Sequence, residues 1–228
     1  MVTAARRLVA MVGCVFFGLL GAPAEAKTDG QQRVVERARL ALDSFLDDPQ
    51  FQYMRVYVQN AYAVLIVPEM LKAGLFFGAE YGVGVLLVRD PQSGDWGQPA
   101  FYGVYGGSLG VQAGGAMSDM VFTIMNEGAV DQLIAHNVQF GGDMAMAVGR
   151  IGGGVGAGTT TQFGEDVYAF SKSKGLYGGL TLDGTVVAPK HDWNEAYYGR
   201  PVDPKQILRT PAGGRTDIAA LHDSLTRF

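Results

Sequence analysis

Hydrophobic residues recur at helical spacing near both ends of the chain. From Val34 to Phe45 they lie three or four positions apart, with charged residues mostly between them, which predicts an amphipathic helix over residues 31–46. Asp47-Asp48-Pro49 is a typical end for such a helix. We expect this helix to pack on a core rather than to lie on a membrane surface. Shorter helices are predicted over residues 52–61, 127–136 and 216–225.

Between these helices the pattern changes to short apolar runs separated by turn residues, which indicates strands. Pro68 is expected to end the first run, and residues 89–95 supply a turn. The strand candidates cover residues 62–67, 74–78, 83–88, 100–105, 109–113, 120–125, 144–148, 166–171, 176–182 and 185–187. Strands of this length and spacing predict a β-dominant α+β fold, in which an antiparallel sheet curls into a barrel or sandwich and is flanked by N- and C-terminal helices.

Composition supports one folded domain. The 228 residues are 48% hydrophobic and 18% charged, which is enough apolar material for one substantial core. The 33 glycines lack the three-residue period of collagen, and they agree with many short strands and tight turns. Because no segment is long enough to act as a linker, residues 27–228 are predicted to form a single domain.

The first 26 residues are typical of a secretory signal peptide. Arg6 and Arg7 precede an uncharged apolar run, and Ala24-Glu25-Ala26 offers a small-x-small cleavage site. An uncleaved anchor helix and lipidation at Cys14 are the alternatives, and cleavage after Ala26 is preferred. The mature chain would then have no cysteine. We therefore expect an exported protein that is periplasmic or associated with the envelope.

Charge and histidine spacing exclude several kinds of site. The net charge of −4 disfavours binding to nucleic acid, which usually needs a basic surface. His136, His191 and His222 lack the spacing of metal ligands, so no metal site is expected. The glycine-rich segment 152–158 lacks the Lys-Ser/Thr pair of a phosphate-binding loop, and a hairpin loop is favoured over an anion-binding nest. No cofactor is predicted.

One segment matches a catalytic motif. Residues 106–110 fit the G-x-S-x-G nucleophile elbow of α/β-hydrolases, with Ser108 in the position of the nucleophile. Its partners would have to be Asp166 with His191 or His222. The residues that follow are glycine-rich and form helices poorly, so a turn between strands is favoured over an enzyme active site.

Many segments, in order, resemble the SYLF domain family, which is also known as an actin-regulator or Las-binding-protein family. The most specific is Tyr168–Gly179, which is close to the family's Y-S-x-S-x-G-L-F-x-G run. The resemblance covers roughly residues 31–227. The other matching segments are 61–68, 72–75, 82–86, 96–102, 107–112, 140–143, 147–149 and 197–199.

The resemblance implies a function without catalysis. Eukaryotic members bind phosphoinositide membranes, and some fungal members bind actin, whereas this chain has an export signal and an acidic net charge. It therefore implies a lipid-binding protein of the bacterial cell envelope, at a phospholipid membrane surface and selective for an anionic or phosphoinositide-like headgroup. The alternative is a structural or protein-interaction module with an envelope protein partner. A serine hydrolase that uses Ser108 is the least favoured.

Two sets of residues are candidates for membrane contact. Alternation along a predicted strand would place the lysines on either side of Ser173 on one face, where they could bind phosphate. The lipid-headgroup candidates are Lys172, Lys174, Arg150 and Lys72. An aromatic cluster near residue 100 could instead meet the apolar part of a membrane interface. The apolar membrane-contact candidates are Trp96, Phe101 and Tyr102.

Overall fold

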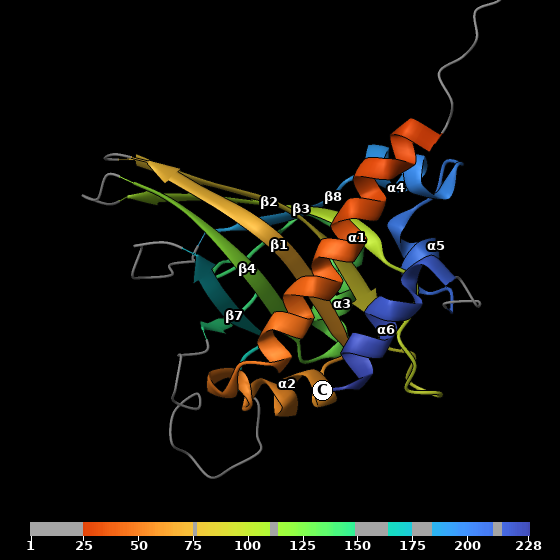
Figure 1. Cartoon of the computed structure of the whole chain (residues 1–228), viewed down its shortest axis with the longest axis horizontal. Helices are drawn as coiled ribbons and strands as arrows, with labels where there is room; N and C mark the ends of the chain where they lie inside the picture. The colour runs from red at the N-terminus through yellow and green to blue at the C-terminus, as the bar shows by residue number, and fades with distance from the viewer. Residues whose placement is uncertain (1–24, 75–76, 110–113, 149–163, 175–183, 212–215) are drawn as a thin grey trace, which may run out of the picture.

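The computed structural model describes residues 25–74, 77–109, 114–148, 164–174, 184–211 and 216–228. Residues 1–24 of the predicted signal peptide, with Cys14, lie outside this part of the chain, as do Arg150, the glycine-rich segment 152–158 and the predicted strand 176–182. A curled sheet forms the centre of the molecule, and helices lie on both of its faces (Figure 1). The α+β prediction is confirmed.

The sheet has eight strands in the order β5-β8-β3-β2-β1-β4-β7-β6. All neighbours are antiparallel except β6 and β7. The strands are β1 (Ala63–Gly74), β2 (Phe77–Val88), β3 (Ala100–Leu109), β4 (Gly114–Ile124), β5 (Val138–Gln139), β6 (Met146–Val148), β7 (Val167–Lys174) and β8 (Val186–Pro189). The four central strands are longer than the short runs that the sequence indicates.

The helices divide between the two faces of the sheet. One face, called the α1 face below, is covered by α1 (Glu25–Leu46), η1 (Pro49–Phe51), α2 (Met54–Asn60), α4 (His191–Tyr198), η2 (Thr216–Ile218) and α6 (Ala219–Thr226). The opposite face, the α3 face, carries α3 (Glu127–Ala135) and α5 (Pro204–Leu208). The four predicted helices are present, and α4 and α5 were not predicted. None of the helices in the described ranges is long and apolar enough to span a membrane.

Two hydrophobic cores lie on the two sides of the sheet. On the α1 face, Val64 and Phe170 pack with Leu42 and Phe45 of α1. On the α3 face, the alternate strand positions, such as Leu65, pack against α3. Burial on both faces explains why the strands are apolar runs without strict hydrophobic alternation.

The prediction that Pro68 ends the first strand is wrong. The β1 strand continues to Gly74 through a bulge between Val67 and Met70. Glu69 in this bulge has a positive φ of 52°, and its N–H donates to Oδ1 of the buried Asp119 at 3.0 Å. The bulge accommodates a proline, which cannot donate a ladder hydrogen bond, in a central strand.

Two glycines of β2 lie directly against this bulge. A Cβ atom on Gly82 would lie 2.5 Å from Cγ1 of Val67, and one on Gly84 would overlap the carbonyl oxygen of Ile66. Both positions therefore require glycine because the bulged strand passes too close for any side chain.

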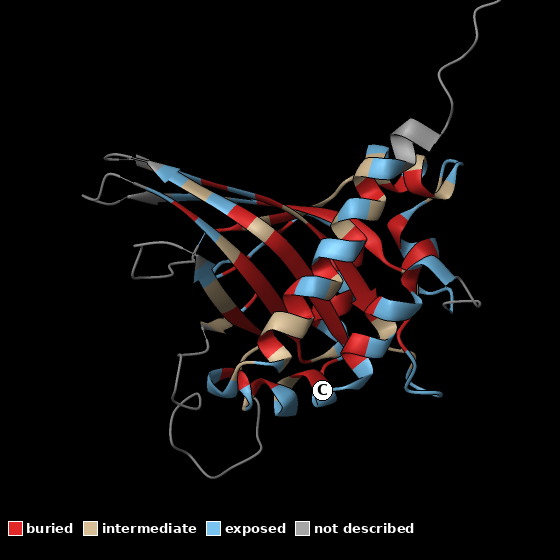
Figure 2. Cartoon of the chain, in the orientation of Figure 1, coloured by how far each residue is buried: buried red, intermediate tan, exposed pale blue. Residues whose placement is uncertain are grey.

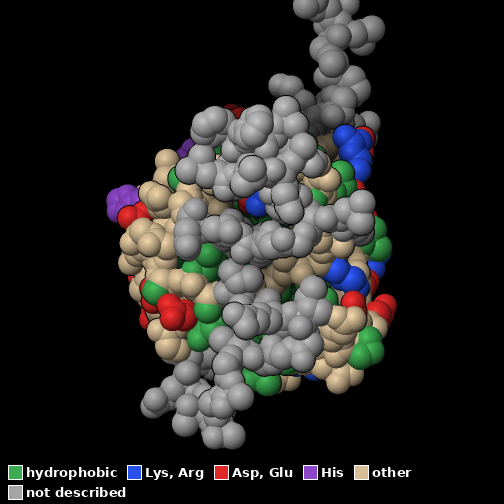
Figure 3. Space-filling model, turned by 90° about the vertical axis from the view of Figure 1, so that its left-hand side faces the viewer, with side chains coloured by type: hydrophobic (Ala, Val, Ile, Leu, Met, Phe, Trp, Pro, Cys, Tyr) green, Lys and Arg blue, Asp and Glu red, His purple; other side chains and the backbone are tan. Residues whose placement is uncertain are grey.

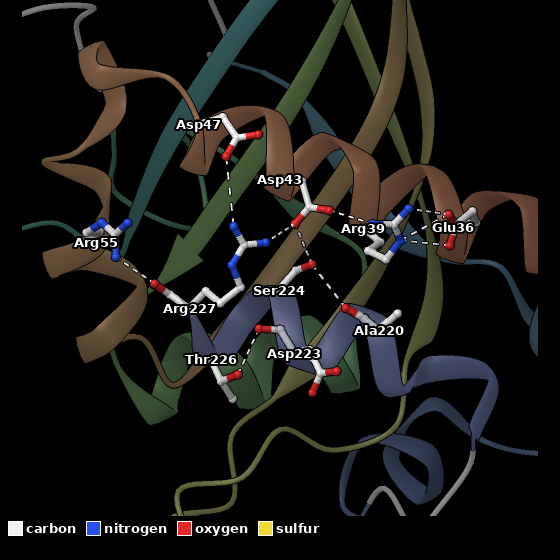
Figure 4. Close-up of polar contacts among 10 residues, drawn as sticks. All are labelled: Glu36, Arg39, Asp43, Asp47, Arg55, Ala220, Asp223, Ser224, Thr226 and Arg227. Atoms are coloured by element: carbon white, nitrogen blue, oxygen red, sulfur yellow. Dashed lines mark hydrogen bonds and ion pairs between the residues drawn. The ribbon is translucent and has the colours of Figure 1, made fainter.

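A polar network joins the last helix to the first (Figure 4). The Asp43 carboxylate accepts hydrogen bonds from Arg39 at 2.6 Å, Ser224 at 2.7 Å and Arg227 at 3.0 Å. Arg55 donates to the backbone carbonyl of Arg227 at 2.7 Å. The network attaches α6 to α1 and α2, so elements from both ends of the described chain cover the same face of the sheet.

Candidate functional site

The central strands extend beyond the helices that cover the rest of the sheet (Figure 1), and burial decreases toward these strand ends (Figure 2). Four large apolar side chains lie exposed there, with exposed fractions of 40% for Met117, 49% for Leu71, 45% for Tyr81 and 40% for Tyr105. Met117 pairs with Leu71, Leu71 with Tyr81, and Tyr81 with Tyr105. The four therefore form one continuous row across β4, β1, β2 and β3, called the tip row below.

The tip row lies on the α1 face. Tyr81 is four residues from Val85, whose side chain packs in the core beneath α1, and residues an even number apart on a strand share a face. Beyond the tip row on the same face lies a second row of small exposed residues, Ala73, Ala79, Gly107 and Gly115. The two rows together are called the tip surface.

The exposed large apolar side chains of the tip row are neighbours rather than scattered over the surface. The Tyr81 and Tyr105 rings are 5.4 Å apart, so they also contact one another. Figure 3 looks onto this end of the molecule and shows hydrophobic side chains among uncharged ones, with most described charged side chains toward the edges. A contiguous exposed apolar patch on a folded protein commonly marks a binding site.

Two described charged groups that border the tip surface are paired within the chain. Arg37 of α1 forms an ion pair with Glu69 in the β1 bulge. Lys172 of β7 lies 2.9 Å from the Asp48 carboxylate and donates to the carbonyl of Ser44 at 2.8 Å. The hydrogen bond from Lys172, together with the Gln50 backbone N–H, lowers the pKa of Asp48 below its ordinary value.

The lipid-headgroup candidates do not converge. Lys172 lies on the α1 face, and the backbone of Lys174 pairs with Met117 on the same face. Lys72 pairs with the buried Glu80, and the Glu80 position alternates onto the α3 face with Leu86. The two described side chains, Lys172 and Lys72, are therefore on opposite faces of the sheet, and each has a carboxylate partner.

The apolar membrane-contact candidates are a correction to the sequence-based prediction, because all three side chains are core residues. Trp96 is buried beneath the Arg89 guanidinium, 4.4 Å from the ring centre. Phe101 packs against Tyr197 of α4, with ring centres 5.0 Å apart. Tyr102 is buried on the α3 face, where its hydroxyl donates to the carbonyl of Leu133 at 3.1 Å. Burial raises the pKa of Tyr102 well above its usual range.

The residues of the hypothetical serine triad are not brought together. Ser108 lies within β3 and pairs with Gly78, rather than in a strand-to-helix turn. It is eight residues from the start of β3, or about 26 Å at ~3.3 Å per residue. His222 lies at that start, with its Nε2 atom 3.0 Å from the carbonyl oxygen of Gly97. His191 and Asp166 also lie toward that end of the sheet, beside the ends of β8 and β7.

A crevice of about 410 Å³ lies at that same end, between the β2–β3 connection, the end of α5, and α6. Its polar side chains serve the fold. Arg89 donates to the carbonyls of Val58 at 3.0 Å and Gln59 at 2.6 Å, which caps the C-terminus of α2. His222 contacts Gly97, and burial lowers the pKa of its imidazole. Among the described residues no cluster of His, Cys, Asp or Glu could hold a metal ion.

The tip row was not predicted from the sequence, although a signal for it exists. Tyr81 and Val83 alternate with Gly82 and Gly84, and Tyr105 is followed by Gly106, so bulky side chains on one face alternate with glycines on the other. Such alternation indicates that the two faces of these strands are packed differently. Assigning the tyrosines to neighbouring positions still requires the strand register.

Comparisons with known proteins agree with the resemblance. The profile of the Ysc84 family, described as "Las17-binding protein actin regulator", matches residues 105–228. Protein YSC84 of Saccharomyces cerevisiae is 29% identical over 200 residues, which is 85% of this chain and 42% of that protein. SH3 domain-containing YSC84-like protein 1 of Xenopus laevis is 31% identical over 166 residues, 72% of this chain and 49% of that protein.

A third relative, LAS seventeen-binding protein 3 of Saccharomyces cerevisiae, is 29% identical over 147 residues, 63% of this chain and 32% of that protein. The chain thus spans less than half the length of each of these relatives.

Proposed function

This chain belongs to the Ysc84 family of Las17-binding actin regulators, and on that premise we propose that it is a non-catalytic module that binds a partner protein through its tip surface. The observation that carries the proposal is the exposed row Met117–Leu71–Tyr81–Tyr105. The name of one relative states that it binds another protein. A non-catalytic role agrees with the positions of Ser108, Asp166 and the histidines, because these residues do not come together into a catalytic triad.

Apolar contact dominates at the proposed interface. Two charged residues at its border, Arg37 and Lys172, already have carboxylate partners, so a partner gains little by presenting charge to either of them. Tyrosine and methionine are enriched at protein interfaces relative to the rest of the surface. Binding is therefore expected to depend weakly on ionic strength.

Site-specific photo-crosslinking tests the proposal. A photoreactive phenylalanine analogue replaces Tyr81 in the full chain in its own cells, and the same analogue replaces Tyr62 as the matched control. Tyr62 is a tyrosine of almost the same exposure, 46%, at the opposite end of β1. We expect a discrete protein adduct at position 81 but not at position 62, with the captured protein identified by mass spectrometry and its binding reproduced with the purified pair. No adduct at position 81, or equal adducts at both positions, contradicts the proposal.

A phospholipid membrane is the second candidate, because an exposed Tyr-Tyr pair beside Leu and Met also suits a membrane interface. Cosedimentation with vesicles of neutral and of anionic phospholipid, at low and at high salt, tests it. Salt-insensitive binding that Leu71→Thr and Tyr81→Thr abolish would assign the tip surface to lipid. Salt-sensitive binding that needs anionic lipid would point instead to headgroup contacts by basic residues.

We also propose that the chain is exported and that its leader is removed after Ala26, which would leave Lys27 as the first residue. N-terminal sequencing of the protein recovered from the cell envelope is the test. A first residue at Cys14 that carries lipid contradicts cleavage after Ala26, and an intact Met1 contradicts removal of the leader.

A further inference from the structure

We infer that the occupant of the tip surface is a single amphipathic helix of the partner protein, lying on the sheet beside α1. This inference rests on the proposed function and adds the form of the partner. The helix would present an apolar face to the tip row and a polar face to solvent. Three features of the described residues support it.

The first feature is continuity with the interface that α1 already makes. The α1 face of the sheet is covered by α1 at Val64 and Ile66, and on the same face no described helix covers Leu71 and Tyr81, which are partly exposed. The surface therefore lies next to α1 on a sheet face that already holds helices. Adjacent helices pack with their axes about 8–10 Å apart.

The second feature is a side wall. Arg37 of α1 reaches Glu69 of β1, and the carbonyl of Ser44 accepts from Lys172 of β7, so this flank of α1 borders the tip surface. The tip row and this flank of α1 thus supply the floor and one side of a shallow site.

The third feature is size. The tip row crosses four strands, which at ~4.8 Å per strand is about 14 Å. An α-helix with its side chains is about 10–12 Å across. A stable interface between two folded proteins buries about 800 Å² on each partner. The tip surface has eight residues, four of them alanine or glycine, so it suits one helix better than a second copy of this chain.

The side chains favour an apolar helix face. The small second row lets a helix approach the backbone closely, and the tip row can receive residues at positions i, i+3, i+4 and i+7. The Tyr81 and Tyr105 hydroxyls can remain at the solvent edge while their rings are covered. Because Arg37 and Lys172 are paired with Glu69 and Asp48, neither of these two residues calls for a charged partner on that helix face.

The test uses two synthetic peptides of about 18 residues, or five helical turns. One places leucine at i, i+3, i+4 and i+7 on an otherwise uncharged polar background, and the other has the same composition in an order without helical period. Both carry a fluorophore, and anisotropy is measured against the purified full chain at low and high salt. We expect the periodic peptide alone to bind, with little effect of salt.

Variants locate the site. Leu71→Thr and Tyr81→Thr are each expected to weaken binding about tenfold or more, because each removes apolar area that the helix covers. Tyr62→Thr, at the matched exposure, is expected to leave binding unchanged. Thermal unfolding of each variant checks that the fold is intact, as expected for substitutions at exposed positions.

The possible results separate this inference from the proposed function. Equal binding of the two peptides, or equal loss with Tyr62→Thr, overturns the helix inference. A specific adduct at position 81 with no peptide binding also overturns it while the proposed function stands. Self-association that Tyr81→Thr abolishes would assign the surface to a second copy, and vesicle binding that it abolishes would assign it to lipid; either result overturns the inference. If neither crosslinking nor peptide binding depends on the tip row, both proposals fail.

Discussion

Replacement of Asn194 by alanine is expected to destabilise the protein strongly, because this α4 side chain completes the start of β3. Asn194 is fully buried. Its Oδ1 accepts from the N–H of Phe101 at 2.7 Å, and its Nδ2 donates to the carbonyl of Phe101 at 3.3 Å. The last residue of β8, Pro189, pairs with Tyr102 of β3. Asn194 therefore supplies the hydrogen-bond partner for Phe101, the next β3 residue beyond the end of β8.

The magnitude follows from these two contacts. The Asn194→Ala variant loses one short and one long neutral hydrogen bond, each with a net contribution of about 0.5–1.5 kcal/mol. The N–H of Phe101 is then left buried without an acceptor, which costs about 1–3 kcal/mol. Its carbonyl keeps the bond from Lys190 N–H at 2.9 Å. We therefore expect a loss of about 2–4 kcal/mol, a large part of the ~5–15 kcal/mol typical of folded domains.

Urea unfolding measures the loss. The midpoint should decrease while the dependence of the unfolding free energy on urea concentration stays constant. Asn137→Ala, at an exposed position, is the matched control and should change stability by less than about 0.5 kcal/mol. Asn194→Asp keeps one acceptor but places a carboxylate in a buried site beside a carbonyl, so it should be at least as unstable. An Asn194→Ala variant as stable as the control would refute the reasoning.

Three further changes test other contacts. Asp119→Ala removes the acceptor for the Glu69 N–H in the β1 bulge and is expected to lower the free energy of unfolding by about 1.5–3 kcal/mol in urea titrations, whereas a loss near zero would contradict this role for the bulge. Ser224→Ala removes one donor to Asp43 and should cost about 1 kcal/mol in wild type but clearly less in an Asp43→Ala background, as a double-mutant cycle would show. Tyr102 stays protonated in the folded protein at a pH where the unfolded chain ionises, so its contribution to stability is complete below pH ~10 and is lost as the pH rises above it. Tyr102→Phe should therefore show a shallower decline of stability between about pH 10 and 12, and an unchanged slope would contradict the assigned cause.

Local periodicity accounts for what could be predicted. The helix of residues 31–46 was correct because its apolar stripe repeats with helical spacing within one segment, and α1 indeed buries Val35, Leu42 and Phe45. The first strand was predicted too short because a proline normally ends a central strand. Here the buried carboxylate of Asp119, fifty residues further along the chain, takes up the N–H freed by the bulge.

The candidate site shows the limit of local reasoning. Phe101 and Tyr105 lie on the same strand and the same face, yet Phe101 is fully buried whereas Tyr105 is 40% exposed. The cause is the position of α4, which packs Tyr197 and Trp193 against Phe101. The glycine after Tyr105 distinguishes the two faces of the strand, but no local pattern around either aromatic residue shows which part of a face a helix covers.

The sequence by itself therefore determined the fold class, the main helices and the family, because each depends on patterns within continuous segments. Only the tertiary structure decided that Leu71, Tyr81, Tyr105 and Met117 form one exposed row, and that Lys172 and Lys72 are paired on opposite faces. The physical reason is that exposure and ion pairing depend on strand register and on which part of the sheet the helices cover. Both are set by contacts between segments far apart in the chain.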